Sequence, residues 1–347
     1  MTLDQRLGTI DCCGVQTPPS PMPNSVVLVT ETEFRRARSS FAAAGELECI
    51  PVAGAEEPLC DAIVHHGTRL IVVGSAPYRG RLYTTLPRGG VIARFGVGYD
   101  NVDTAQATRA GLLCTNTPDV LQQSVAELTM FLIGLAARHL VSAAAGVQAG
   151  RWEPREGIEL EGKTLALIGC GAIARAVARM ASAGFGMRVI GYTRSLREVP
   201  GPEFAAVTND YEEVVRSADF VSLHIPGSPE NARFMDTARL AVLPARAWLI
   251  NTARGSVVDE VALYEALATG RLAGAALDVF AREPYQPAGS NHDLRTLPNV
   301  IGVPHIGSNT VEANRRMAHR ALRNIRLAID GDLAAMDLIN REVLWAR

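Results

Sequence analysis

The stretch T-L-A-L-I-G-C-G-A-I-A, from Thr164 to Ala174, decides the fold. Its first half is mostly aliphatic and predicts a buried strand, and an alanine-rich helix follows. Between them, Gly169, Gly171 and Ala174 stand at the G-x-G-x-x-[GA] spacing of dinucleotide-binding turns. A second strand is predicted from Met187 to Tyr192, so the spacing occurs in a strand–helix–strand context. The sequence therefore favours dinucleotide binding over a plain turn.

Each small residue of this turn has a physical reason. Gly169 permits a tight turn, Gly171 lets the backbone approach a pyrophosphate, and Ala174 lets the helix pack close to the strand. The first turn of the helix begins with Ala172 and Ile173, and its N–H groups and positive dipole end would hold the phosphates.

Length and composition set the broad class. A chain of 347 residues, with 48% hydrophobic and 20% charged residues, predicts two globular domains with ample core. The formal net charge of −2 argues against a general nucleic-acid or acidic-membrane binder. The most apolar helix, Leu128 to Ala137, is about half the ~20 residues that a membrane span needs, so we expect no membrane partner.

The six cysteines form no CxxC pair and no regular framework, which favours reduced thiols in a cytosolic protein. The N-terminus lacks the pattern of a secretory signal, and we expect a cytoplasmic location. No metal site is predicted.

From Ser25 onward, strand-like and helical runs alternate, which predicts an α/β fold of parallel sheets with helices on both faces. We expect a proline-rich extension over residues 1–23, either surface-draped or a binding tail. The predicted domains are 24–118 together with 309–347, and 119–308.

Three of the expected helices bear on the domain organisation. Thr32 to Ala44 has helical character within the first domain. Asp119 to Leu140 is long and apolar on several faces, so we expect it to be buried between domains or between subunits. The final helix, Val311 to Ile329, is expected to pack back on the first domain.

Three predicted strand ends in the second domain carry polar side chains: Arg254 in T-A-R-G, Glu283 in F-A-R-E-P and His305 in P-H-I-G. Ligands of doubly wound sheets bind beyond the carboxyl ends of the strands, so these groups are expected near the cofactor. An arginine can grip a substrate carboxylate and polarise the adjacent carbonyl. A histidine can supply the proton that accompanies hydride addition, and a carboxylate can orient its ring. Singly, each has a plainer reading, as an ion pair, a solvated loop acid or a capped turn.

Longer motifs make the chain resemble the D-isomer-specific 2-hydroxyacid dehydrogenase family over about Ser25 to Leu338. The matching motifs, in chain order, are R-F-G-V-G-Y-D-N-V-D (Arg94–Asp103), N-T-P-D-V-L (Asn116–Leu121), V-A-E (Val125–Glu127), L-E-G-K-T-L-A-L-I-G-C-G-A-I-A (Leu160–Ala174), N-T-A-R-G (Asn251–Gly255), A-L-D-V-F with E-P (Ala276–Pro284) and P-H-I-G (Pro304–Gly307).

The resemblance implies roles for individual residues. Arg254 would bind the substrate carboxylate and carbonyl, His305 would be the general acid/base, and Glu283 its partner. The backbone N–H groups of Val97 and Gly98 would hold the carboxylate from the other side of a cleft. Asp278 and Thr252 are assigned to the cofactor site, with Asp278 contacting the nicotinamide carboxamide. The implied fold is a Rossmann NAD(P)-binding domain and a discontinuous, flavodoxin-like substrate domain, usually in a homodimer joined through the cofactor domains.

Cofactor choice is addressed by the residues after the strand that ends at Tyr192. An NAD-preferring site would usually carry an acid there for the ribose hydroxyls, but the chain has Thr193, Arg194 and Ser195. A cation with two hydroxyls suits a 2′-phosphate. We therefore predict a preference for NADP(H), with NAD(H) use as the alternative.

The function that follows is reduction of a small 2-oxo acid, such as glyoxylate or hydroxypyruvate, to the D-2-hydroxy acid. A D-3-phosphoglycerate dehydrogenase is the nearest rival within the class. A nucleotide-sensing, corepressor-like binding protein is the rival from another class. Turnover of a panel of 2-oxo acids separates the enzyme from the sensor.

Overall fold

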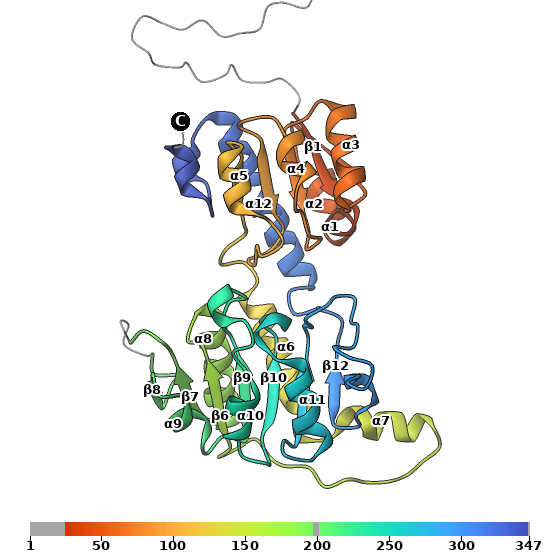
Figure 1. Ribbon diagram of the computed structural model, residues 1–347, viewed down its shortest axis with the longest axis vertical. Coiled ribbons are helices and arrows are strands. Elements are labelled where there is room, and N and C mark those ends of the chain that lie inside the picture. The colour runs from red at the N-terminus through yellow and green to blue at the C-terminus, as the bar shows by residue number, and fades with distance from the viewer. Residues whose placement is uncertain (1–24, 197–200, 346–347) are drawn as a thin grey trace, which may run out of the picture. The chain divides into compact units, whose positions relative to one another are not determined.

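The computed structural model describes residues 25–196 and 201–345, so the predicted extension over 1–23 lies outside the described residues. The chain forms two compact units (Figure 1). Unit 1 runs to Pro118 and resumes at Asn314, and unit 2 runs from Asp119 to Ala313. The chain first passes from unit 1 to unit 2 after Pro118. It passes back after Ala313, and Thr310 accordingly still contacts Ser124 of unit 2, with hydroxyl oxygens 2.8 Å apart.

Unit 1 is built on a five-stranded parallel sheet in the order β2-β1-β3-β4-β5. This is the flavodoxin-like strand order, so the predicted class of this part is confirmed. The strands are β1 (Ser25–Thr30), β2 (Leu47–Val52), β3 (Leu70–Val73), β4 (Val91–Arg94) and β5 (Leu113–Thr115). The helices are α1 (Glu31–Arg36), α2 (Arg38–Ala42), α3 (Glu56–His66), α4 (Arg81–Thr85), α5 (Thr104–Arg109) and the long α12 (Val311–Asp330), followed by short 3-10 turns at Leu333–Ala335 and Arg341–Leu344.

Unit 2 is built on a seven-stranded parallel sheet in the order β12-β11-β10-β9-β6-β7-β8. Counted from its first strand, this is the Rossmann order with one strand added, which confirms the predicted dinucleotide-binding fold. The strands are β6 (Thr164–Ile168), β7 (Arg188–Tyr192), β8 (Ala206–Thr208), β9 (Phe220–Leu223), β10 (Trp248–Asn251), β11 (Gly274–Leu277) and β12 (Val300–Gly302). The α-helices are α6 (Gln122–Ala137), α7 (Leu140–Gln148), α8 (Ala172–Arg179), α9 (Tyr211–Val215), α10 (Thr237–Ala241) and α11 (Glu260–Ala268).

The core of unit 2 follows from strand alternation. Successive side chains of a strand point to opposite faces of the sheet. Leu165 and Leu167 pack into the layer with α6 and α8, whereas Ala166 and Ile168 pack into the layer with α9, α10 and α11. All five residues of β6 are buried, as expected of a central parallel strand covered on both faces.

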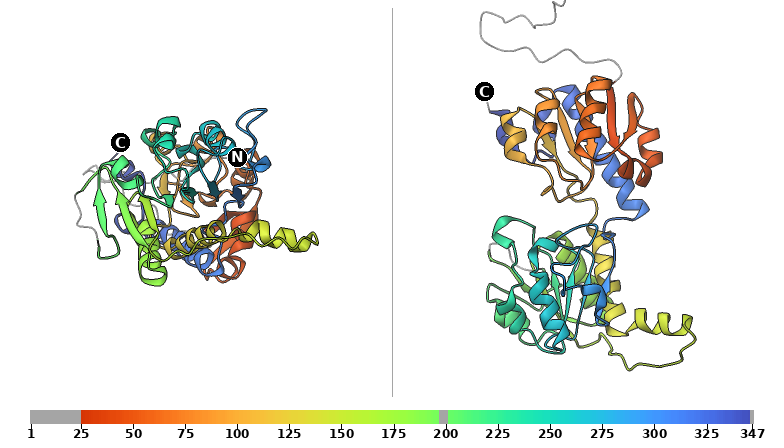
Figure 2. Two further views of the ribbon diagram at one scale, coloured as in Figure 1. Left: turned by 90° about the horizontal axis from the view of Figure 1, so that it is seen from below. Right: turned by 45° about the vertical axis from the view of Figure 1, so that its right-hand side comes forward.

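Two predicted helices are each broken in the structure. The run from Thr32 to Ala44 forms α1 and α2, separated at Ala37, whose φ of −130° is not helical. The run from Asp119 to Leu140 ends at Ala137, because His139 adopts a left-handed φ of 51° before α7 begins. Helix α7 extends away from the layered body of unit 2 and has no buried residue (Figures 1 and 2). A third difference is β8, a short edge strand that the sequence pattern did not predict.

Within the described part of the chain, no single helix is both long and apolar enough to cross a membrane. Helices α6 and α7 pass that length and composition test only as a pair, and they are bent by 66° at their junction.

Candidate active site

The glycine turn lies at the point where the strand order of the unit 2 sheet reverses. Strand β6 has β7 on one side and β9 on the other, and the turn joins β6 to α8. Gly169 has a φ of +100°, and a Cβ there would lie 2.5 Å from the carbonyl oxygen of His224 at the end of β9. A side chain at this position is therefore excluded by both conformation and space.

Gly171 and Ala174 have the properties expected of a phosphate-binding turn. Gly171 precedes α8, and a Cβ built on it meets no atom within 4 Å, so open space lies beside the backbone. Ala174 is fully buried against the sheet. Ala172 begins the helix and is exposed, Ile173 is partly buried, and no acidic residue occupies the first turn. The N-terminus of α8 can therefore accept an anion.

The segment after β7 forms a small polar turn. The Thr193 N–H donates to Thr208 O (3.0 Å), which ties the turn to β8. Its hydroxyl donates to Ser195 O (3.2 Å) and accepts from Ser195 N–H (3.4 Å). Arg194 and Ser195 are exposed. A guanidinium and two hydroxyls thus lie directly after β7.

Arg254 follows β10 in a segment held by one side chain. The Asn251 side chain accepts from Ala253 N–H (3.0 Å) and donates to Arg254 O (2.9 Å). The Arg254 side chain passes close to Gly227, where a Cβ would lie 2.8 Å from Arg254 Cγ. The Arg254 side chain therefore lies between its own segment, which Asn251 holds, and the backbone of Gly227.

Gly255 brings this segment against the loop that carries Glu283. A Cβ on Gly255 would lie 1.9 Å from the carbonyl carbon of Phe280 and 2.3 Å from Ala281 N. The same loop is tied down by Glu260, whose carboxylate accepts from Ala281 N–H (2.7 Å). The loops of Arg254 and Glu283 are therefore in backbone contact at Gly255, and this contact leaves no room for a side chain there.

Glu283 and His305 form a direct pair. The Nδ1 of His305 lies 2.6 Å from Oε2 of Glu283, and Oε1 of Glu283 accepts from Phe280 N–H (3.0 Å). Burial by itself raises the pKa of Glu283, but the hydrogen bond and charge of His305, with smaller contributions from Phe280 N–H and Arg254, outweigh it. The pKa is therefore below its ordinary value, and the carboxylate is ionised at neutral pH. The bond to Nδ1 leaves Nε2 of the ring to face a substrate.

Asp278 holds the backbone on which His305 sits. Its side-chain oxygens accept from Ile306 N–H (2.6 Å) and Gly307 N–H (2.9 Å), and its carbonyl accepts from His305 N–H (2.9 Å). His305 itself has a positive φ of 51°, so these bonds hold a conformation that non-glycine residues rarely adopt. Burial raises the pKa of Asp278, and the two amides oppose this only in part. The carboxylate thus has backbone partners, while the expected carboxamide contact stays a prediction.

The remaining predicted residues lie in two places. Thr252 is almost fully buried, and its hydroxyl is 2.9 Å from that of Thr129 in α6. Val97 and Gly98 lie in unit 1, in the loop after β4, and the Val97 carbonyl accepts from the Asn116 side chain (2.7 Å). The structure therefore brings Glu283 and His305 together, places Arg254 within electrostatic reach of Glu283, and sets Val97 and Gly98 in the other unit.

Sequence reasoning did not identify three supporting residues. Gly255 stands inside the quoted motif N-T-A-R-G, but its contact is with a loop distant in sequence. His224 directly follows β9, and its ring is 2.9 Å from the Ser222 hydroxyl while its carbonyl faces Gly169. Its place at a strand end was the available signal. Asn116 stands inside the quoted motif N-T-P and had no assigned role. Among the described residues, no group of three or more His, Cys, Asp or Glu side chains is arranged to hold a metal ion.

Comparison with known proteins identifies a family. The model for the NAD binding domain of D-isomer specific 2-hydroxyacid dehydrogenases matches residues 130–307. The glyoxylate reductase of Thermococcus litoralis is 40% identical over 272 residues, covering 76% of this chain and 80% of the relative. The D-3-phosphoglycerate dehydrogenase of Methanocaldococcus jannaschii is 41% identical over 247 residues, covering 70% of this chain but 46% of the relative.

A solved structure agrees over a larger share of the chain. It is the NADPH-dependent glyoxylate/hydroxypyruvate reductase from Sinorhizobium meliloti in complex with NADP and malonate. It is 31% identical, covers 87% of this chain and 93% of its own, and has a TM-score of 0.74.

Proposed function

Because the chain belongs to the D-isomer specific 2-hydroxyacid dehydrogenase family and is thereby an NAD(P)-dependent oxidoreductase, we propose that it reduces glyoxylate or hydroxypyruvate to the D-2-hydroxy acid. The observation that carries the proposal is the Glu283–His305 pair, 2.6 Å apart, beside the loop of Arg254. A general acid must be held in one orientation, and this pair does so.

Arg254, His305 and Glu283 have different tasks in the proposed reaction. Arg254 binds the substrate carboxylate and polarises the carbonyl that is reduced. His305 donates a proton from Nε2 to the carbonyl oxygen, and the ionised Glu283 orients the ring through its bond to Nδ1. The N–H groups of Val97 and Gly98 bind the carboxylate. A reduced nicotinamide supplies the hydride that this proton accompanies.

The glycine turn fits a dinucleotide, since open space beside Gly171 and an acid-free helix N-terminus suit a pyrophosphate. We further propose that unit 2 is the cofactor domain and unit 1 the substrate domain, because the matched NAD binding model falls within unit 2. The finer preference for NADP(H) is supported by Thr193, Arg194 and Ser195, and by the similar reductase that binds NADP.

The test is turnover by the whole chain of glyoxylate, hydroxypyruvate and 3-phosphohydroxypyruvate with NADPH. We expect Arg254→Ala and His305→Ala each to retain NADPH binding and to lose kcat by about 100-fold or more. His292→Ala is the matched control for His305→Ala, because His292 also pairs with a glutamate in unit 2 (2.9 Å from Glu265) and is expected to leave kcat unchanged.

Three outcomes would change the assignment. A higher kcat/KM for 3-phosphohydroxypyruvate would favour the phosphoglycerate dehydrogenase, which the relative from Methanocaldococcus jannaschii keeps as the second candidate. No turnover of any 2-oxo acid, with NADPH still bound, would favour a nucleotide sensor. Near-normal kcat in either alanine variant would remove that residue from the mechanism.

We also propose a homodimer joined through unit 2. Leu140, Val141 and Val147 of α7 are 49%, 48% and 57% exposed, an unusual apolar surface for a helix that extends beyond its own domain. A second copy would cover it. Sedimentation should give a dimer that Val141→Asp dissociates, and a wild-type monomer at micromolar concentration would end this proposal.

A cytoplasmic location completes the proposal. Four cysteines in the described residues, Cys49, Cys60, Cys114 and Cys170, are free thiols, which suits a reducing compartment. Recovery of the enzyme in the cytosolic fraction of the source cells is the check.

A further inference from the structure

The loop from Phe95 to Asn101 follows β4 and is fixed at both ends. At its start, Gly96 N–H donates to the hydroxyl of the buried Thr117 (3.0 Å), and Thr117 N–H donates to Gly96 O (3.0 Å). At its end, the Asn101 side chain donates to Gly74 O (2.9 Å) and Ala76 O (2.8 Å). Between these anchors Val97 and Tyr99 are 37% and 43% exposed, so the middle of the loop is open to solvent.

One side chain reaches the middle of the loop. Nδ2 of Asn116 donates to the carbonyl oxygen of Val97 (2.7 Å). This carbonyl and the N–H of Gly98 belong to the same planar peptide group, in which they point in opposite directions. A bond that fixes the carbonyl therefore also fixes the direction of the Gly98 N–H. It further polarises the peptide, which makes that N–H a better donor.

We propose that Asn116 is a positioning residue, which holds the Val97–Gly98 peptide so that Gly98 N–H faces the substrate carboxylate. The inference rests on the proposed function, because that function assigns the carboxylate to this peptide. Without the bond, the peptide group can rotate about its flanking bonds, and glycine at position 98 opposes such rotation least.

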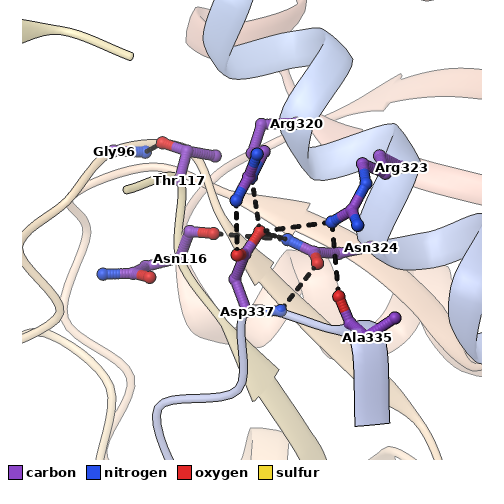
Figure 3. A network of polar contacts seen from close by, with 8 residues as sticks. All are labelled: Gly96, Asn116, Thr117, Arg320, Arg323, Asn324, Ala335 and Asp337. Atoms are coloured by element: carbon purple, nitrogen blue, oxygen red, sulfur yellow. Dashed lines mark hydrogen bonds and ion pairs between the residues drawn. The ribbon is translucent and has the colours of Figure 1, made fainter. Parts of the chain in front are cut away.

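Asn116 is itself held by the C-terminal part of unit 1 (Figure 3). Its carbonyl accepts from Nδ2 of Asn324 in α12 (3.3 Å), a residue that is fully buried. Asn324 in turn exchanges hydrogen bonds with Asp337, through Nδ2 to the carboxylate (3.1 Å) and from Asp337 N–H to Oδ1 (2.9 Å).

The Asp337 carboxylate closes this network. It accepts two bonds from Arg320, from Nε (2.6 Å) and Nη2 (2.7 Å). A bidentate pair of this kind fixes geometry as well as charge. The backbone of Asn116 is thereby anchored to α12, so its side chain reaches Val97 from a fixed point.

The test compares Asn116→Ala and Asn116→Asp with the wild-type chain. Both variants remove the donor, and aspartate also places a negative charge near an anionic substrate. We expect KM for glyoxylate to rise about five- to tenfold in Asn116→Ala and further in Asn116→Asp, with kcat within about twofold and KM for NADPH unchanged. A tenfold change corresponds to about 1.4 kcal/mol, within the range for one hydrogen bond.

Gln106→Ala is the matched control. Gln106 also donates from a side-chain amide to a backbone carbonyl of unit 1, Arg79 O (3.1 Å), but not to the loop. We expect its KM to stay at the wild-type value. Amide hydrogen exchange of residues 95–101 is the second readout: it should accelerate in both Asn116 variants and not in Gln106→Ala.

The outcomes separate this inference from the proposed function. Faster exchange with an unchanged KM, or an unchanged exchange rate, would overturn the positioning role. A kcat that falls as much as KM rises would also overturn it. If the wild-type chain reduces no 2-oxo acid, the proposed function fails, and the positioning of the substrate carboxylate fails with it. If the wild type turns over a 2-oxo acid but the Asn116 variants keep its KM and exchange rate, the positioning role is refuted and the proposed function stands.

Discussion

Replacing Gly255 by alanine tests whether backbone contact between two loops sets the active-site geometry. The added Cβ would lie 1.9 Å from the carbonyl carbon of Phe280, whereas real Cβ atoms do not approach other atoms closer than 3.0 Å. The loops must therefore separate by at least about 1.1 Å. Overpacking of this kind costs about 1–3 kcal/mol of stability. Phe280 N–H also bonds to Glu283, so the shift reaches the Glu283–His305 pair, and a displacement of about 1 Å costs roughly 100-fold in rate.

The assay measures the urea unfolding midpoint of Gly255→Ala, its kcat with glyoxylate and its Kd for NADPH. We expect a lower midpoint, a kcat reduced by about 100-fold, and a Kd that changes little because the glycine turn lies elsewhere. Gly134→Ala in α6 is the control, since a Cβ there meets no atom within 4 Å and alanine favours the helix. A Gly255→Ala protein with wild-type midpoint and kcat would refute the reasoning.

Two further predictions concern the cofactor turn and the partly buried His224. Arg194→Ala should lower kcat/KM for NADPH by about tenfold or more, with little effect on kcat/KM for NADH. The control is Arg188→Ala, which removes the same charge at the other end of β7 and should change neither value. A wild-type enzyme that clearly prefers NADH would exclude the NADP(H) proposal. Burial lowers the pKa of His224 from 6.5 to about 4, so between these values the unfolded chain binds a proton that the folded chain does not. The free energy of unfolding should therefore decrease as the pH is lowered from 6.5 to about 4, by up to about 3 kcal/mol. His224→Gln should lose that part of the pH dependence, and parallel curves for the two proteins would contradict it.

Much of the fold is readable from local pattern. The aliphatic run before Gly169, the spacing to Ala174 and the strand that ends at Tyr192 each depend on residues close together in sequence. Their periodicity and turn chemistry are therefore present in the sequence itself. The same holds for the strand-end positions of Arg254 and His305, because parallel strands place their carboxyl ends at one edge.

The features that sequence missed depend on tertiary contacts or on a single backbone angle. The break at His139 rests on one left-handed residue, and helical periodicity continues across it. The contact of Gly255 with Phe280 and the bond from Asn116 to Val97 join segments that no local pattern relates. Strand β8 is three residues long and exists through its pairing with β7.

The cradle that Asp278 makes for His305 has a consequence for how sequences of this kind can diverge. Gly307 leaves room for the carboxylate, since a Cβ there would lie 2.9 Å from Asp278 Oδ2, and its N–H is one of the bonds that the carboxylate accepts. Changes at positions 278 and 307 are therefore strongly epistatic: once either is lost, the second substitution removes little that is left to lose. Selection therefore meets the two positions as one unit and not as two independent sites.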